Sequence, residues 1–574
     1  MRTLLSPVFT FLACLAITTP AVLAGDPIRD RLNAIQEAHL RGRSARHDDH
    51  AGRSADDLVA RTVGGEAAGG RWLNDRTAPF AVARTGFPNV SFELPESYAG
   101  LLPIDEGGDR ELFFWFVPTE NEAAKDEIVI WLNGGPGCSS MFGFVKENGP
   151  FNWMVGQYEP VKNHYAWNNL SNVVWIEQPV GTGYSRGIPT AKSEDDIVVE
   201  FGKFWKNFID LFDLKERKVY ITGESYAGRY IPYIADYMLH QNETTYFNVS
   251  GIMIYDPAID YEMIHEDVPT LSMIESNRNS FPFNDTFNDF LQNKSAVCGF
   301  DDLLEKGLTF PPEGHFDLPI GAWPNGTVKD DCATFSDAAR AIFLLNPCFN
   351  YYEVSQLCPV PWDVLGFPSS TFYLPRGYPN PYFNRSEVKA ALHAPADANW
   401  TVCAEHPVFV GGEDNSTDLS PPSGHNGGPL ARVIERTNNV IVGQGSLDMV
   451  VITKGTLLSL NNLTWNGAQG FSKAPAEPFY VPAHDVPFVE SMSGSGVFGS
   501  WGRDRGLTFV TTELAGHALP GFVQSAGYRQ LEVLLGRIAN LSDTSPFTTQ
   551  PDYPQPKGPL GKGNTPLQAV LGSV

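Results

Sequence analysis

The sequence has little positive charge and few charged residues of any kind. Its 574 residues contain 41 Lys and Arg against 66 Asp and Glu, a formal net charge of −25 at pH 7. A surface of this sign repels a phosphate backbone, which argues against a nucleic-acid partner and disfavours binding to anionic membranes. Hydrophobic residues make up 42% of the chain and aromatic residues 12%, so a disordered or fibrous protein is also excluded.

Long apolar runs are scarce as well, and the one that exists starts the chain. Arg2 precedes the apolar residues 8–17, and the small residues of 22–24 follow them. This pattern is typical of a secretory signal peptide over residues 1–24. A membrane anchor is the other interpretation, but the run is short and Pro20 interrupts it. We therefore expect secretion, with a vacuolar location as the weaker alternative.

Cysteine is sparse, and its number is odd. Removal of the signal peptide takes Cys14 away from the seven cysteines. The six that remain are Cys138, Cys298, Cys332, Cys348, Cys358 and Cys403. An even set in an oxidising compartment predicts three disulfides. No cluster has the spacing of a zinc site, so neither a metal nor another cofactor is expected.

Sequons for N-glycosylation are frequent, and together they support secretion. Each N-x-S/T tripeptide is weak alone because it arises by chance, but twelve occur in a chain that begins with a signal peptide. Their asparagines are Asn89, Asn169, Asn242, Asn248, Asn284, Asn293, Asn325, Asn384, Asn399, Asn415, Asn462 and Asn540.

The two ends of the chain differ from its middle. Residues 25–84 are polar and contain no lysine, which fits a propeptide-like leader and a plain solvated extension equally well. The folded domain is expected from residue 85, where aromatic residues become frequent. Residues 546–574 form a C-terminal tail whose last part is too polar for a lipid-anchor signal.

Short apolar runs alternate with amphipathic segments between these ends. Continuous apolar runs bounded by Gly or Pro suit strands buried on both faces of a mostly parallel sheet. Strands are expected at 91–94, 111–117, 127–132, 172–177, 218–222, 251–255, 439–443 and 508–512. Helices are expected at 195–212, 229–240 and 385–393. The alternation predicts an α/β fold with a mixed, mostly parallel sheet.

One stretch breaks this alternation. Residues 261–375 hold four of the six remaining cysteines and many prolines near their end. We expect an inserted cap that is stapled by disulfides. It divides the α/β core into a first part, residues 85–260, and a second part, residues 376–545.

The sharpest local motif is GESYAG at residues 223–228. It follows a predicted strand and precedes a predicted helix, the setting in which a nucleophilic serine is presented on a strained turn. Ala227 stands where the strict pattern has a glycine, and so short a motif often arises by chance. Its place between strand and helix therefore carries the prediction that Ser225 is a nucleophile.

A nucleophilic serine needs a base, and the base needs a carboxylate to orient it. Asp448 follows the predicted strand 439–443, and His517 follows the predicted strand 508–512. These residues give the chain order Ser, Asp, His of an α/β-hydrolase. Other histidines, such as His393 and His484, are expected to be surface or structural residues.

Several segments together resemble the serine carboxypeptidase family. They are 133–140 (NGGPGCSS), 177–185 (EQPVGTGYS), 223–228 (GESYAG), 382–388 (YFNRSEV) and 515–517 (AGH). The match spans about residues 87–540, and the secreted, acidic, sequon-rich character is most similar to fungal members. The resemblance implies an α/β-hydrolase fold with a cap, and the removal of single C-terminal amino acids from peptides.

The resemblance also assigns roles to individual residues. It implies that Ser225 is the nucleophile, that His517 is the general base and acid, and that Asp448 orients His517. The backbone N–H groups of Gly135 and Tyr226 would form the oxyanion hole, where one lost donor can cost roughly 3–4 kcal/mol.

An exopeptidase must also recognise a free carboxylate. By resemblance, Asn133, Glu147 and Glu224 bind the C-terminal carboxylate of the substrate. A carboxylic acid can donate a hydrogen bond to that group only while it is protonated, and two clustered glutamates cannot both ionise cheaply. We therefore expect the peptidase to work best at acidic pH.

Some residues depart from the family pattern. The family usually has Gly-Asn after the strand 251–255, whereas this sequence has Asp256-Pro257-Ala258. Its histidine motif normally continues with Met-Val-Pro, and Ala518 in place of that methionine leaves more room for the departing residue. These departures bear on specificity rather than on the class of reaction.

The resemblance implies one disulfide and leaves two open. Cys138 pairs with Cys403 by resemblance. Nested and sequential bridges are both compatible with the remaining four cysteines.

We therefore expect a secreted serine carboxypeptidase that acts on peptide or protein C-termini through an acyl-enzyme. The alternatives are an acyltransferase or esterase on the same scaffold, and a non-catalytic carrier or protective protein. The complete set of catalytic and carboxylate-binding residues argues against both. A monomer or homodimer is expected, without a nucleic-acid or membrane partner.

Overall fold

The computed structural model describes residues 70–366, 381–413, 415–425, 427–484 and 493–555. All of them belong to the second of two units, Met1–Ala60 and Arg61–Val574. The predicted signal peptide, most of the predicted leader and the last part of the predicted tail lie outside the described residues. None of the described helices is long and apolar enough to cross a membrane.

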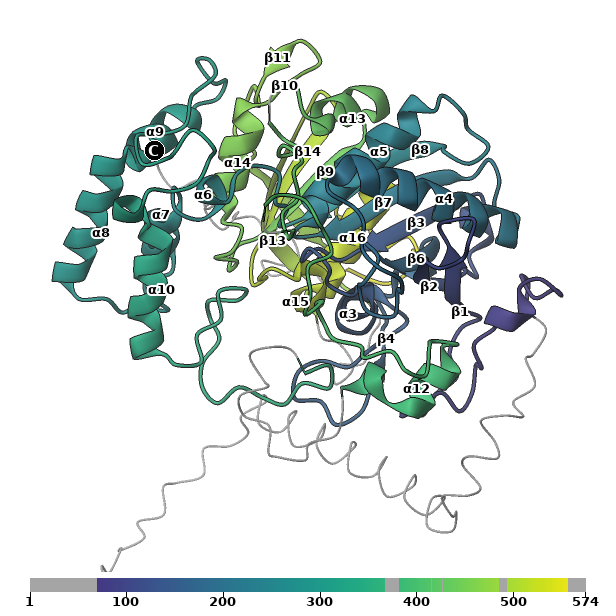
Figure 1. Ribbon diagram of the computed structural model, residues 1–574. Helices are drawn as coiled ribbons and strands as arrows, with labels where there is room; N and C mark the ends of the chain where they lie inside the picture. Colours follow the sequence, from purple (N-terminus) through teal and green to yellow (C-terminus); the bar gives the residue numbers. More distant parts are fainter. Residues whose placement is uncertain (1–69, 367–380, 414, 426, 485–492, 556–574) are drawn as a thin grey trace, which may run out of the picture. The chain divides into compact units, whose positions relative to one another are not determined.

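A ten-stranded mixed sheet lies at the centre of the described chain (Figure 1). In spatial order its strands are β1 (Tyr98–Pro103), β2 (Glu111–Val117), β6 (Asn172–Glu177), β3 (Glu127–Leu132), β7 (Lys218–Glu224), β8 (Val249–Tyr255), β9 (Val440–Gly445), β14 (Leu507–Thr512), β13 (Gly496–Asp504) and β12 (Glu477–Val481). The strands from β6 to β14 pair in parallel, and the two strands at each edge are antiparallel. The predicted α/β fold with a mostly parallel sheet is confirmed.

One predicted strand, 91–94, is wrong. The chain forms no strand there, because Pro95 follows Leu94 and the N–H of Leu94 bonds the carbonyl of Arg84 within a loop. The first edge strand is instead β1. Strands β12 and β13 were not predicted, because glycine, serine and proline interrupt their apolar residues.

Helices cover both faces of the sheet, as the side chains of β3 show. Ile128 and Ile130 pack in one core cluster with residues of α4 (Glu194–Phe212), α5 (Ala227–His240) and α13 (Pro429–Thr437). Val129 and Trp131 point the other way and join a cluster with residues of α3 (Ser140–Gly143) and α16 (Gln524–Leu534). Successive residues of a strand face opposite sides, so a continuous apolar run is what a doubly covered strand requires.

Residues 70–84, which the sequence places in the leader, pack with the core. The Trp72 ring lies 6.2 Å from the ring of Phe116, and the Phe80 ring lies 5.6 Å from that of Phe114. The last part of the predicted leader therefore covers β2, and aromatic packing begins upstream of residue 85.

The inserted segment is helical. It contains α6 (Glu262–His265), α7 (Thr270–Ser276), α8 (Asp285–Cys298), α9 (Phe300–Gly307) and α10 (Thr334–Leu345). Figure 1 shows α7, α8, α9 and α10 grouped beside the sheet, and α6 and α9 contact α14 (Thr453–Asn462) of the core. Disulfides join Cys298 to Cys332 and Cys348 to Cys358, which is the sequential arrangement.

The remaining elements are short. They are η1 (Ala78–Phe80), η2 (Glu122–Ala124), η3 (Phe144–Asn148), η4 (Trp167–Asn169), η5 (Asp330–Cys332), η6 (Tyr382–Asn384), α12 (Ser386–Ala391), α15 (Leu519–Phe522) and the two small ribbons β4 (Phe151–Asn152) with β5 (Val161–Lys162) and β10 (Thr464–Trp465) with β11 (Ala468–Gln469).

Candidate active site

Ser225 lies in a tight turn between β7 and α5. Only Ser225 and Tyr226 separate the strand from the helix, and Ser225 has a φ of 63°, which is uncommon for a residue other than glycine. Gly223, two residues before the serine, has no room for a side chain, because a Cβ there would lie 2.0 Å from the carbonyl oxygen of Leu132. The Ser225 N–H donates to the carbonyl of Tyr255 at 2.9 Å. These contacts over-determine a strained conformation that presents the serine.

Asp448 and His517 follow the neighbouring strands β9 and β14 and form a hydrogen bond. Nδ1 of His517 lies 2.7 Å from Oδ2 of Asp448, and both side chains are buried. The backbone N–H groups of Val450 and Val451 also donate to Asp448, at 2.8 and 3.2 Å. Among the described residues, no group hydrogen-bonds the buried Nε2 of His517. The structure thus orients the imidazole, while Nε2 remains available to a serine hydroxyl or a substrate.

The inserted segment contacts this histidine through Tyr352. The N–H of His517 donates to the Tyr352 carbonyl at 2.8 Å, and the two rings lie 5.1 Å apart. A Cβ at Gly516 would lie 2.2 Å from the same carbonyl oxygen. Sequence reasoning missed Tyr352, since no motif surrounds it and its approach depends on how the insertion folds back.

A glycine-rich loop after β3 lies against the serine turn. A Cβ at Gly134 would lie 2.3 Å from the backbone nitrogen of Tyr226, so the two main chains touch. Gly135 has a φ of 113°, a conformation that glycine adopts readily. Among the described residues, neither Gly135 nor Tyr226 donates its backbone N–H to another group. The loop and the turn therefore bring together two amide groups without acceptors, as an oxyanion hole requires.

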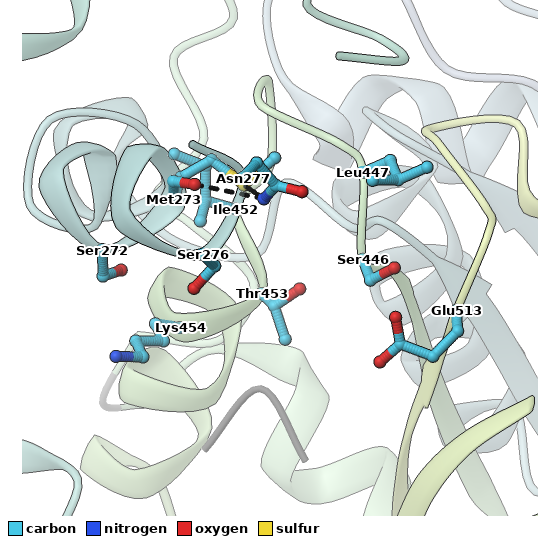
Figure 2. A pocket seen from close by; sticks show the side chains of 10 residues that line it. All are labelled: Ser272, Met273, Ser276, Asn277, Ser446, Leu447, Ile452, Thr453, Lys454 and Glu513. Carbon is cyan, nitrogen blue, oxygen red and sulfur yellow. Dashed lines mark hydrogen bonds between the residues drawn. The ribbon is translucent and has the colours of Figure 1, made fainter. Parts of the chain in front are cut away.

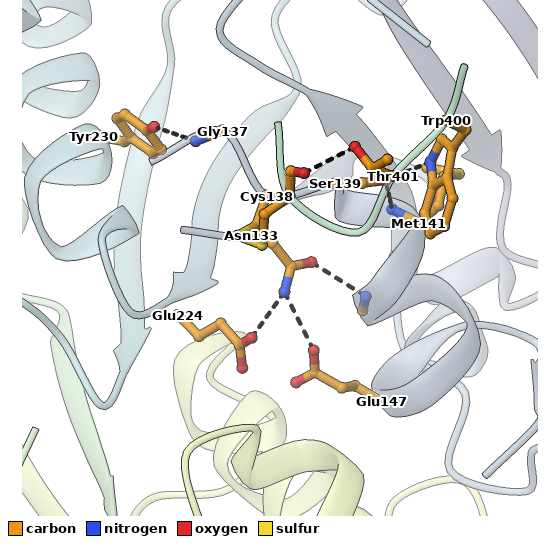
Figure 3. Close-up of a disulfide and its surroundings, with 12 residues drawn as sticks. Asn133, Gly137, Cys138, Ser139, Met141, Glu147, Glu224, Tyr230, Trp400 and Thr401 are labelled. Carbon is orange, nitrogen blue, oxygen red and sulfur yellow. Dashed lines mark hydrogen bonds between the residues drawn. A yellow bond between two sulfur atoms is a disulfide. The ribbon is translucent and has the colours of Figure 1, made fainter. Parts of the chain in front are cut away.

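A disulfide and buried hydrogen bonds hold the glycine-rich loop in place. A disulfide joins Cys138 to Cys403 (Figure 3). The N–H of Ser139 donates to the Val402 carbonyl at 2.7 Å. The Ser139 hydroxyl also bonds the carboxyl of Glu177, which is fully buried. The pairing that the resemblance implied is thus the one that the structure contains.

Asn133, Glu147 and Glu224 converge beside the serine turn. The Asn133 side-chain amide donates to Glu224 at 2.8 Å and to Glu147 at 3.4 Å, and Figure 3 shows it pointing between the two carboxyl groups. Trp131 Nε1 and the Gly143 N–H donate to the amide oxygen at 2.8 and 3.1 Å, which fixes its orientation. One oxygen of each glutamate is buried and receives no hydrogen bond from an N–H or hydroxyl group of the described residues, and the two carboxyl groups lie within hydrogen-bonding reach of each other. The arrangement has spare capacity for one further hydrogen-bonding group.

Burial makes both carboxyl groups weak acids. It raises the pKa of Glu147 well above its ordinary value, and the charge of Glu224 raises it further. Burial also raises the pKa of Glu224, to about 7, although the nearby His517 opposes this shift. The two side chains can therefore carry protons in mildly acidic solution.

The same groups act on the histidine. Burial lowers the pKa of His517, but the charges of Asp448 and Glu224 outweigh it and raise the pKa above its ordinary value. Protonation of Glu224 removes one of these charges, so it favours the neutral imidazole that a general base requires.

A second buried aspartate, Asp256, lies at the end of β8. Its Oδ1 accepts hydrogen bonds from Gln444 Nε2 at 2.6 Å and from the Gly445 N–H at 2.8 Å. Asp256 also lies within hydrogen-bonding reach of Asp448. The sequence marked Asp256 only as a departure from a family pattern, although its place at the end of a parallel strand was a signal.

A separate cavity of about 90 Å³ lies behind the Asp448 loop, between α7, α14 and the ends of β9 and β14 (Figure 2). Ser446 and Leu447 line it, and none of the predicted site residues does. Figure 2 shows Glu513 beside Ser446, with Thr453 and Lys454 on the facing helix. In the part of the chain that the structure describes, no group of three or more His, Cys, Asp or Glu residues is placed to hold a metal ion.

Comparison with known proteins adds independent findings. The sequence model of the serine carboxypeptidase family matches residues 88–535. The chain is 46% identical over 482 residues to a "Probable serine carboxypeptidase" of Arthroderma benhamiae, a match that covers 82% of this chain and 88% of the relative. It is 41% identical over 536 residues to "Serine-type carboxypeptidase F" of Aspergillus niger, covering 91% and 98%.

A solved structure is similar in fold. The crystal structure of a prohormone-processing carboxypeptidase from Saccharomyces cerevisiae superposes with a TM-score of 0.58 at 23% sequence identity. The superposition covers 80% of this chain and 96% of that one. At this identity the likeness supports the fold alone.

Proposed function

The chain belongs to the serine carboxypeptidase family and is a serine-type carboxypeptidase, a hydrolase, and on this premise we propose that Ser225, His517 and Asp448 form its catalytic triad. Ser225 attacks the carbonyl carbon of the last peptide bond while Nε2 of His517 accepts its proton. His517 then gives that proton to the departing amino acid, and water repeats the two steps on the acyl-enzyme. The hydrogen bond between His517 and Asp448 is the observation that carries this proposal.

The oxyanion of each tetrahedral intermediate would bind the N–H groups of Gly135 and Tyr226. Their proximity is fixed by the contact between Gly134 and the Tyr226 nitrogen, so the donors need no rearrangement during the reaction. The buried support from Cys138 and Glu177 holds the loop that supplies one of them.

The carboxylate of the departing residue would bind Asn133, Glu147 and Glu224. These glutamate oxygens, which receive no N–H or hydroxyl donor from the described residues, can donate hydrogen bonds to it only as carboxylic acids. Since the pKa of Glu224 is about 7, ionisation above neutral pH would place a negative charge against the substrate carboxylate. We infer that this sets an alkaline limit and that peptidase activity is best at acidic pH.

The test compares blocked dipeptides that have free or amidated C-termini between pH 4 and 9. We expect kcat/KM for the free acid to fall about tenfold per pH unit above pH 7, because a group titrates that fast above its pKa. The amide should be a poor substrate, and its kcat/KM should not show this fall above pH 7. Glu224→Gln should remove the alkaline limb, while Glu305→Gln, a change at an exposed residue of α9, should leave it in place. A constant or rising kcat/KM from pH 5 to 8 contradicts the acidic-pH proposal, and equal rates on the amides contradict carboxylate recognition.

We also propose that the protein is secreted and N-glycosylated. None of the twelve sequon asparagines is buried, so each is accessible to modification. Asn384 is the least suited, because its side chain donates to the Trp400 carbonyl at 2.6 Å and accepts from the Trp400 N–H at 2.8 Å. Digestion of the secreted protein with an endoglycosidase should lower its apparent mass, and an unchanged mass contradicts glycosylation.

A further inference from the structure

The carboxyl group of Asp256 has one oxygen without a donor, in a fully buried position next to the proposed triad. Its Oδ1 accepts from Gln444 and Gly445, whereas Oδ2 receives no hydrogen bond from any described residue. The residue itself is 0% exposed and has a φ of 43°, and its N–H is tied to the Gly443 carbonyl at 2.9 Å. The backbone therefore fixes this side chain in place.

The group within its reach is another carboxyl, that of Asp448. Two carboxylate oxygens repel each other unless one of them carries a hydrogen. Asp448 already receives hydrogen bonds from the Val450 and Val451 N–H groups and from Nδ1 of His517. Three donors stabilise the negative charge of Asp448, so the shared hydrogen belongs on Asp256.

The surroundings of Asp256 favour its neutral form. The titratable groups that face it are Asp448 after β9, Glu224 at the end of β7 and its own neighbour Tyr255, and none of these is a cation. Gln444 of β9 and the Gly445 N–H are its uncharged partners. Burial and then the charge of Asp448 raise the pKa of Asp256 well above its ordinary value.

We propose that Asp256, as a carboxylic acid, donates its hydrogen to Asp448 and is a positioning residue for His517. A further hydrogen bond to Asp448 disperses its negative charge. Asp448 then attracts the protonated imidazole of His517 less strongly, so the pKa of His517 falls and the ring stays neutral to a lower pH. An asparagine at this position could donate in the same way, but it could not ionise. In this chain the contact is therefore lost at high pH. This inference rests on the proposed roles of Ser225, His517 and Asp448.

The experiment follows the rate at which a fluorophosphonate labels Ser225, as a function of pH. Labelling needs a neutral His517 but no substrate carboxylate, so it does not depend on recognition by Glu224. For Asp256→Ala we expect the midpoint of the acid limb to rise by about one pH unit, which makes labelling about tenfold slower on that limb. Asp256→Asn keeps a donor and should keep the wild-type midpoint. Asp267→Ala is the matched control, since Asp267 is a buried aspartate of the insertion that accepts from the Phe335 N–H.

Each outcome separates the possibilities. A midpoint that is unchanged in Asp256→Ala, with only a lower Tm as in Asp267→Ala, shows a purely structural residue and overturns the inference. Equal shifts in Asp256→Asn and Asp256→Ala overturn it as well, because the amide should rescue. Wild-type protein that is folded but not labelled at Ser225 refutes the proposed function instead.

A second measurement applies if Asp256→Ala does not fold. Because the pKa of Asp256 is raised in the folded state, its contribution to stability is lost as the pH rises towards that pKa. Asp256→Asn should therefore lose less Tm than the wild type as the pH rises from about 4 to 9. An equal loss in both proteins overturns the inference.

Discussion

Glu177 allows a quantitative prediction of how stability depends on pH. This carboxyl is 0% exposed and accepts hydrogen bonds from the Ser139 hydroxyl, the Tyr184 N–H and Trp400 Nε1. Burial, opposed by these donors, raises its pKa from 4.5 to about 7. The folded state therefore holds a proton that the unfolded state releases between these pH values. Stability from this group is complete below about pH 4.5 and is lost as the pH rises to about 7.

The magnitude follows from the same numbers. A rise from 4.5 to about 7 corresponds to a loss of about 3 kcal/mol in the free energy of unfolding. Glu177→Gln cannot titrate, so its stability relative to the wild type should increase by that amount between pH 4.5 and 8. For roughly 460 described residues, about 3 kcal/mol corresponds to a change of about 3 °C in Tm.

The assay is thermal unfolding at a fixed scan rate at pH 4.5, 6, 7 and 8 for wild type, Glu177→Gln and Glu106→Gln. Glu106 is exposed, so its substitution is the matched control. The Tm difference between Glu177→Gln and wild type should move by about 3 °C in favour of the variant as the pH rises. If that difference stays constant within about 1 °C, the buried carboxyl is not protonated in the folded state and the reasoning is refuted.

Three further predictions concern single contacts. Ser225→Ala should reduce kcat/KM by roughly 10⁵-fold or more with an unchanged Tm, and substantial residual activity would exclude Ser225 as the nucleophile. Replacing both Cys138 and Cys403 by serine should cost about 2–5 kcal/mol and lower kcat, since the linked loop supplies an oxyanion donor; an unchanged Tm and kcat contradict this. Lys146→Met should lower the free energy of unfolding by about 3–5 kcal/mol, because it leaves the buried carboxylate of Asp363, 3.0 Å away, without its ion-pair partner. The double variant Lys146→Met/Asp363→Leu should recover much of this stability. No recovery would show that the broken ion pair is not the cause of the loss.

Much of the sheet could be predicted because a strand covered on both faces needs a continuous apolar run. EIVIWL at 127–132 and NVVWIE at 172–177 meet that requirement, and both are strands with the expected bounds. Edge strands such as β12 lack this constraint, since one side of β12 pairs with no other strand of the sheet. Their sequences therefore carry little signal.

The same reasoning explains what could be foreseen at the site. Ser225, Asp448 and His517 each follow a strand of one parallel sheet, so their proximity follows from topology once the strands are known. Tyr352 reaches His517 from an insertion whose helices pack through their own apolar residues, and no periodic pattern encodes that approach. The role proposed for Asp256 depends on its contact with Asp448, which lies almost two hundred residues away in the sequence. A single sequence does not reveal pairwise contacts of this kind.

The bond between Cys138 and Cys403 has a consequence for the integrity of the chain. The two cysteines are separated by 265 positions in the sequence, and the serine turn and the whole insertion lie between them. A single proteolytic cut in an exposed loop inside this span yields two polypeptides that remain covalently joined. The ten-stranded sheet and the buried core would still hold them in register, so such a nicked, two-chain enzyme should keep its fold and release its pieces only after reduction and denaturation.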